Sequence, residues 1–136
     1  MRILGLDHGT KRIGVAVSDE LKMIAQPLEF ILAEPQPQAL DRLLAIIRDK
    51  EVELILVGMP RNMDGSYGPA AEKVREFVAQ IHTVTPVPVR TWDERLTSAQ
   101  ANRVMIEANV RRDKRREKVD AMAAAVLLQS FLDAQN

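Results

Sequence analysis

Cysteine is absent from this chain of 136 residues, and histidine occurs only twice. Without thiols the chain has no disulfide bond, no thiolate zinc ligand and no cysteine nucleophile. Aromatic residues make up 4% of the sequence, too few for an extensive surface on which nucleic-acid bases could stack. Neither sign of charge is in excess, because 19 basic residues balance 19 acidic ones. Any binding of nucleic acid therefore requires a local basic patch.

Long hydrophobic segments are also missing. The longest apolar run, Ala121–Leu128, is far shorter than the ~20 residues that span a bilayer. Asp7 stands where a signal peptide would need apolar residues, so we expect a cytoplasmic protein without a membrane partner. Apolar residues at 46% and charged residues at 28% are typical of a globular protein, and the length fits a single domain over residues 1–136.

Hydrophobic patterning predicts an α/β domain with a five-stranded mixed sheet flanked by helices. The expected strands lie at residues 3–6, 13–18, 28–32, 54–57 and 87–92. The first three follow one another closely and can pair antiparallel, whereas the last two are each preceded by a helix and should join in parallel. Helices are expected around residues 40–47 and 70–81, after Thr97, and at 119–132.

The first two strands should form a hairpin with one small face. A four-residue turn would place Asp7 opposite Arg12 and Gly5 opposite Gly14. Together with Ala16, these glycines leave room for the alanine-rich final helix to pack closely against the hairpin.

Three acidic residues that are far apart in sequence should meet at one edge of this sheet. Asp7 ends the first strand, Glu94 follows the last one, and Asp120 is in the same helical register as Ala124. Parallel strands present their carboxyl ends at one edge, where open α/β sheets bind ligands. Converging carboxylates repel one another unless a cation lies between them, and hard oxygen ligands suit Mg²⁺ or Mn²⁺. Two such ions ~4 Å apart promote phosphodiester cleavage.

Each acidic residue also has an ordinary structural explanation. Asp7 could start a turn and Asp120 could cap a helix. Asp93 and Glu94 could be ordinary loop charges, although Asp93 could also join the metal site. His8, beside Asp7, is a candidate for contact with a substrate phosphate.

A basic run, Arg111–Lys118, precedes the last helix and contains six basic and two acidic residues. We expect it to guide a phosphate backbone toward the acidic edge, although such runs are also typical of solvated segments. The candidate nucleic-acid contacts are Lys11, Arg12, Arg61, Arg95, Arg111, Arg112, Lys114, Arg115, Arg116 and Lys118.

Four segments, distributed in order along almost the whole chain, resemble the YqgF family of Holliday-junction-resolvase-like proteins, also described as pre-16S rRNA nucleases. They lie at residues 4–16, 57–66, 93–98 and 118–124. The resemblance implies a ribonuclease H-like fold and a bacterial protein that matures the 5′ end of 16S rRNA on the ribosome precursor. The family's acidic residues carry over to Asp7, Glu94 and Asp120.

The sequence thus predicts a nuclease that hydrolyses phosphodiesters with Mg²⁺ or Mn²⁺, with two ions held by Asp7, Glu94 and Asp120. Two alternatives stay open beside cleavage of pre-16S rRNA. One is a resolvase that cuts branched DNA, and the other is a non-catalytic RNA-binding factor in ribosome assembly.

Overall fold

The structure is a computed structural model that describes residues 1–9, 11–62, 64–94 and 112–135, without the side chains of residues 112–120. In chain order the elements are β1 (Arg2–His8), β2 (Arg12–Ser18), β3 (Ala25–Leu32), α1 (Gln36–Asp49), β4 (Val52–Met59), α2 (Pro69–Val84), β5 (Val89–Asp93) and α4 (Arg112–Gln135). The helix expected after Thr97 lies outside the described residues.

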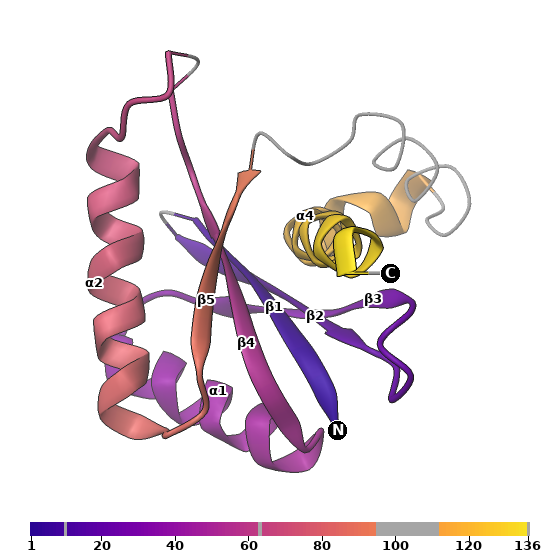
Figure 1. Cartoon of the computed structure of the whole chain (residues 1–136). Coiled ribbons are helices and arrows are strands. Elements are labelled where there is room, and N and C mark those ends of the chain that lie inside the picture. Colours follow the sequence, from indigo (N-terminus) through magenta and orange to yellow (C-terminus); the bar gives the residue numbers. More distant parts are fainter. Residues whose placement is uncertain (10, 63, 95–111, 136) are drawn as a thin grey trace.

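A five-stranded mixed sheet forms the centre of the fold, with the strand order β3-β2-β1-β4-β5. Strands β1, β2 and β3 pair antiparallel, and β4 and β5 continue the sheet in parallel with β1. Helices α1 and α2 cover one face and α4 covers the other (Figure 1). The predicted fold class is confirmed, and the carboxyl ends of β1, β4 and β5 share one edge.

The register of the β1–β2 hairpin differs from the predicted one. Asp7 lies opposite Gly14 rather than Arg12, and Gly5 lies opposite Ala16. The turn is tighter than expected, because the Gly9 N–H donates a hydrogen bond to the Arg12 carbonyl at 2.8 Å. The prediction was wrong because β1 continues one residue beyond Asp7 before the chain turns.

Strand β3 begins three residues earlier than predicted and includes Pro27. Proline cannot donate a hydrogen bond, so it is tolerated at the edge of a sheet, where β3 lies. The pairing with β2 is irregular between Val15 and Ala16, where the partners change from Glu29 to Pro27.

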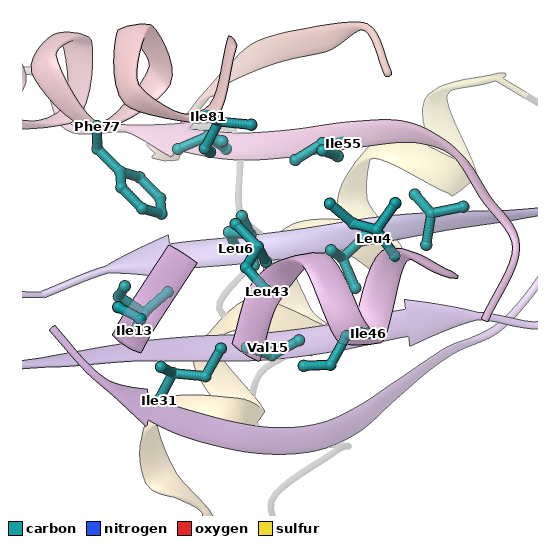
Figure 2. Close-up of a cluster of buried hydrophobic side chains, with 14 of the residues drawn as sticks. Leu4, Leu6, Ile13, Val15, Ile31, Leu43, Ile46, Ile55, Phe77 and Ile81 are labelled. Carbon is teal, nitrogen blue, oxygen red and sulfur yellow. The ribbon is translucent and has the colours of Figure 1, made fainter. Parts of the chain in front are cut away.

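The larger hydrophobic core fills the space between the sheet and helices α1 and α2. Leu4 and Leu6 of β1 are fully buried there, and Leu43, Phe77 and Ile81 reach them from the two helices (Figure 2). Alternation along each strand sends these side chains to one face, which leaves the intervening residues to face α4.

A second core lies between the sheet and α4, and Gly5 of β1 allows the helix to approach the sheet closely. A Cβ atom placed on Gly5 would lie 2.9 Å from the Cβ of Leu128 and 3.3 Å from the Ala124 carbonyl oxygen. The helix therefore rests almost on the backbone of β1, as the small face of the hairpin predicts.

Helix α4 begins at Arg112, whereas the hydrophobic pattern predicts a start at Val119. Residues 112–118 of the basic run are therefore part of this helix. Arginine, lysine and glutamate are good helix formers, and the apolar pattern could not reveal a polar first half. Within the described part of the chain, no helix has the length and hydrophobicity needed to cross a membrane.

Candidate active site

Asp7 lies near the end of β1 and faces α4. Its neighbours Leu6 and His8 both point to the opposite face, where Leu6 is buried in the larger core and His8 stacks on Phe77 with ring centroids 4.6 Å apart. Because successive strand residues alternate, Asp7 belongs to the α4 face.

Glu94 follows β5 and extends over β4 toward β1. A Cβ atom on Gly58 would lie 2.8 Å from the Glu94 Oε1 and 2.9 Å from the Leu127 Cδ2. The bare backbone of β4 at Gly58 thus provides the space that the Glu94 carboxylate occupies beneath α4. Since β4 separates β5 from β1, this position brings Glu94 to Asp7.

The two carboxyl groups interact directly. Burial, the charge of Asp7, a hydrogen bond with the Asp7 side chain and the charge of Asp93 together raise the pKa of Glu94 to about 7. A pKa in this range means that Glu94 holds a proton through mildly acidic pH and donates it to Asp7. A divalent cation could take the place of the proton between Asp7 and Glu94, because its charge would remove the repulsion between the two carboxylates.

Asp120, the third predicted ligand, lies within α4 and eight residues after its start at Arg112. It is therefore not the helix cap that one interpretation of the sequence offered. It precedes Ala124, whose carbonyl rests against Gly5, by about one turn. The side chain of Asp120 is outside the description, so its place beside Asp7 stays a prediction.

The described donors fit a hard divalent cation. Asp7 and Glu94 offer carboxylate oxygens, which Mg²⁺ and Mn²⁺ prefer to nitrogen or sulfur. Among residues with described side chains, no group of three histidine, aspartate or glutamate side chains could by itself hold a metal ion. Asp120 is not among those residues, so the three-carboxylate site stays a prediction.

Asp93 forms an ion pair with Arg61, and its charge also contributes to the raised pKa of Glu94. Its Oδ2 lies 3.5 Å from the Arg61 Nη1, and the Arg61 Nε donates to the Gly65 carbonyl at 3.0 Å. Arg61 thereby connects the loop after β4 to the end of β5, next to Glu94. This contact gives both residues a structural role that the sequence did not indicate.

The other basic residues predicted to bind nucleic acid fall into three groups. Lys11 and Arg12 are exposed at the β1–β2 turn, on the side of the sheet edge that carries Asp7. The described backbone of α4 carries Arg112, Lys114, Arg115, Arg116 and Lys118. Arg95 and Arg111 lie outside the described residues.

His8 does not face the acidic pair, because its ring stacks on Phe77 on the opposite side of the sheet, so a contact of His8 with a substrate phosphate stays a prediction. Its ring borders a pocket of about 290 Å³ on the α1 and α2 side of the sheet. Burial lowers the pKa of His8, which favours the neutral ring at neutral pH. Strand alternation, already visible in the sequence, separates His8 from Asp7.

Phe30 is a surface residue of this region that sequence reasoning missed. It lies on β3 opposite Gly14, with 38% of its surface exposed, and the Arg12 guanidinium lies 4.9 Å from its ring centre. Its hydrophobic neighbours in the sequence made Phe30 look like part of a buried strand.

Strand order and strand directions are those of a ribonuclease H-like fold, and two carboxylates converge at the edge of its sheet. The RuvC resolvase of T. thermophilus, solved with a Holliday junction substrate, superposes with a TM-score of 0.65 at 18% identity, covering 100% of this chain and 97% of that one. The Fowlpox virus resolvase, also solved with Holliday junction DNA, gives a TM-score of 0.61 at 12% identity, covering 99% of each chain. These likenesses support the fold.

The family model RuvX, described as Holliday junction resolvase, matches residues 1–134, and the chain belongs to this family. A relative from Halothermothrix orenii is 49% identical over 136 residues, with 100% of this chain and 97% of the relative covered. Another from Symbiobacterium thermophilum is 52% identical over 135 residues, with 99% and 94% covered. Both relatives carry the name "Putative pre-16S rRNA nuclease".

Proposed function

We propose that this protein is a divalent-metal-dependent nuclease that cleaves the precursor of 16S rRNA near its 5′ end. The observation that carries the proposal is the Asp7–Glu94 pair at the carboxyl edge of the sheet, where burial and mutual repulsion raise the pKa of Glu94 to about 7. The names of the relatives, which cover the full chain at about half identity, support the choice of substrate.

In this proposal Asp7, Glu94 and Asp120 hold Mg²⁺ or Mn²⁺, in two ions. Bound ions of this kind supply Lewis-acid activation of water and neutralise the charge of the cleaved phosphate. The protein's own contribution is to hold Asp7 and Glu94 together at the edge of the sheet, beside α4, where both are half-buried. Gly58 supports this role, since any larger residue would push the Glu94 carboxylate away.

Basic residues on both sides of the pair would bind the RNA backbone. Lys11 and Arg12 stand at the hairpin turn, and the basic half of α4 precedes Asp120. We propose that the RNA passes between these two groups and so brings a phosphate to the acidic pair. We further propose that the chain acts as a single domain in the cytoplasm, on RNA within the ribosome precursor.

The test is incubation of the purified protein with precursor 16S rRNA, with and without Mg²⁺ or Mn²⁺. We expect shortening of the 5′ end that requires the ion and is lost in Asp7→Asn and in Glu94→Gln. Asp41→Asn is the matched control, because it removes an exposed carboxylate on α1, across the sheet from the site. Cleavage that persists in folded Asp7→Asn protein contradicts the metal site, and RNA binding without cleavage favours an assembly factor.

Cleavage of branched DNA is a second candidate, favoured by the family description of a Holliday junction resolvase. A four-way DNA junction in the same assay separates the two substrates. Paired, symmetric cuts in the junction together with uncut precursor RNA would favour the resolvase.

A further inference from the structure

The end of β5, which carries Glu94, is held on both faces of the sheet. Trp92 pairs with Gly58 and packs into the core beneath α4. Asp93 pairs with Met59, a residue of the larger core, so the Asp93 side chain points to the α1 and α2 side. Glu94 points back to the α4 side, over Gly58. The direction of the Glu94 side chain therefore depends on how the backbone at Asp93 is held.

Arg61 contacts Asp93 from the loop that follows β4. Its Nη1 lies 3.5 Å from the Asp93 Oδ2, and the two side chains are only 28% and 17% exposed, so solvent screens this ion pair less than one at the surface. The same guanidinium donates through Nε to the Gly65 carbonyl at 3.0 Å, and its carbon lies 4.6 Å from the ring centre of Tyr67. Contacts with three different residues thus fix one guanidinium between the loop and the end of β5.

The loop that carries Arg61 is closed by hydrogen bonds of its own. The Asn62 N–H donates to the Ser66 carbonyl at 2.8 Å, and the Gly65 N–H donates to the Asn62 carbonyl at 2.9 Å. Gly65 has a φ of 89°, a conformation that favours glycine and that closes this turn. These hydrogen bonds give Arg61 a defined base from which it reaches Asp93.

We propose that Arg61 is a positioning residue that acts through Asp93 to hold the Glu94 carboxylate in the acidic pair. A phosphate bound by Arg61 would compete with the contacts that the guanidinium already makes, so this role differs from the nucleic-acid contact that the sequence predicts for Arg61. The proposal rests on the proposed nuclease function, because Glu94 is the residue that is positioned.

The test measures kcat for cleavage of precursor 16S rRNA at saturating RNA and Mg²⁺, and RNA binding in a chelating buffer. Arg61→Ala and Asp93→Ala should each lower kcat about 10- to 100-fold, because misplacing a reacting group by about 1 Å has a cost of this size. RNA affinity and its dependence on salt should stay unchanged in Arg61→Ala. A phosphate contact predicts the reverse, namely an unchanged kcat and weaker binding with a salt slope shallower by about 0.7 units.

The two side chains of the ion pair should act as a unit. The double variant, Arg61→Ala with Asp93→Ala, should therefore lower kcat no more than either single change does. Losses that multiply in the double variant would show that the two residues act independently and would overturn the proposal. If thermal unfolding shows that Arg61→Ala is not folded, an unchanged kcat in folded Asp93→Ala overturns the proposal from the other partner.

Arg75→Ala is the matched control. The Arg75 guanidinium lies 4.8 Å from the centre of the same Tyr67 ring, but its ion pair is with Glu72 of α2. Its removal deletes an equal charge beside that ring and should leave kcat unchanged. A second measurement does not depend on cleavage. Mg²⁺ should raise the melting temperature of Arg61→Ala less than that of Arg75→Ala, because a displaced carboxylate holds the ion less well.

The outcomes separate this proposal from the proposed function. If the unaltered protein cleaves precursor RNA and Arg61→Ala cleaves it at the same rate, the positioning role is wrong and the nuclease stands. If the unaltered protein does not cleave, the nuclease is wrong and the effect of Mg²⁺ on the melting temperature decides the positioning role. A smaller effect in both Arg61→Ala and Asp93→Ala supports that role, and an effect equal to that in the unaltered protein overturns it.

Discussion

At the scale of single residues, the surroundings of Glu94 change its pKa strongly. Its pKa rises from 4.5 to about 7 through burial, the charge and hydrogen bond of Asp7, and the charge of Asp93. The folded protein therefore binds a proton that the unfolded chain releases at lower pH. The stability linked to this proton is complete below about pH 4.5 and is lost as the pH rises through about 7.

We expect the metal-free protein to lose thermal stability between about pH 5 and about pH 8, and Asp7→Asn to reduce that loss. The asparagine removes one of the charges that repel ionised Glu94. Thermal unfolding in a chelating buffer measures both profiles, with Asp41→Asn as a control of equal charge change. A profile that Asp7→Asn leaves unaltered would show that the two carboxyl groups do not interact.

A divalent ion should reverse this effect. We expect Mg²⁺ to raise the melting temperature at about pH 8, where both carboxylates are ionised, and to raise it less in Asp7→Asn. Saturation at a hundred times the dissociation constant corresponds to about 2.7 kcal/mol. Calorimetry with and without Mg²⁺ checks this, and equal stabilisation of the two proteins would place the ion elsewhere.

At the scale of elements, two glycines control how α4 packs on the sheet. Gly5 sits beneath Leu128 and Ala124, and Gly58 sits beneath Leu127 and Glu94. Both positions are tight, but only Gly58 borders a residue of the candidate site. The two glycines therefore allow packing and site geometry to be separated.

We expect Gly5→Ala to lower the free energy of unfolding by about 1–3 kcal/mol, the usual cost of overpacking, because its Cβ would meet the Leu128 Cβ and the Ala124 carbonyl. Gly58→Ala should lower it less, because its Cβ would meet the movable ends of the Glu94 and Leu127 side chains. Gly58→Ala should also displace the Glu94 carboxylate and lower the cleavage rate far more than Gly5→Ala does. Urea unfolding and cleavage rates of both variants check this. Equal cleavage rates of the two folded variants would show that Gly58 does not position Glu94.

Patterns within single segments predicted most of these elements, but not the register of the hairpin or the start of α4. Continuous apolar residues in β4 and the spaced apolar positions of α2 are visible in the sequence. The hairpin register was not, because it depends on the hydrogen bond between Gly9 and Arg12 in the turn. The early start of α4 was missed because a polar helical segment carries no apolar period.

The candidate site was predictable to the extent that topology alone determines it. The order of strands brings Asp7 and Glu94 to one edge, and this part is confirmed by their interaction. The ion pair between Arg61 and Asp93 was not predictable, since it depends on the conformation of the loop after β4.

At the scale of the whole molecule, charge is separated although the net charge is zero. The segment from Arg111 to Lys118 has six basic and two acidic residues, so the rest of the chain is acidic overall. A polyanion would therefore be attracted to one part of the surface and repelled by much of the remainder.

We expect replacement of Arg115 and Arg116 by alanine to weaken RNA binding and to make the slope of log affinity against log salt shallower by about 1 to 2 units. Alanine also favours helix, so the melting temperature should hardly change. A salt titration with fluorescent RNA measures the slope. Unchanged affinity would show that the basic half of α4 does not contact phosphates.

The outer strand β3 has a consequence for how copies of this protein behave at high concentration. Exposed edge strands offer a template on which another chain can add its own strand and begin to aggregate. A chain approaching β3 would meet Pro27, which has no N–H to offer, and an irregular pairing beside it that bends the strand. The proline thus disfavours the addition of a strand at β3, and Pro27→Val is expected to leave the protein folded but prone to precipitate on concentration.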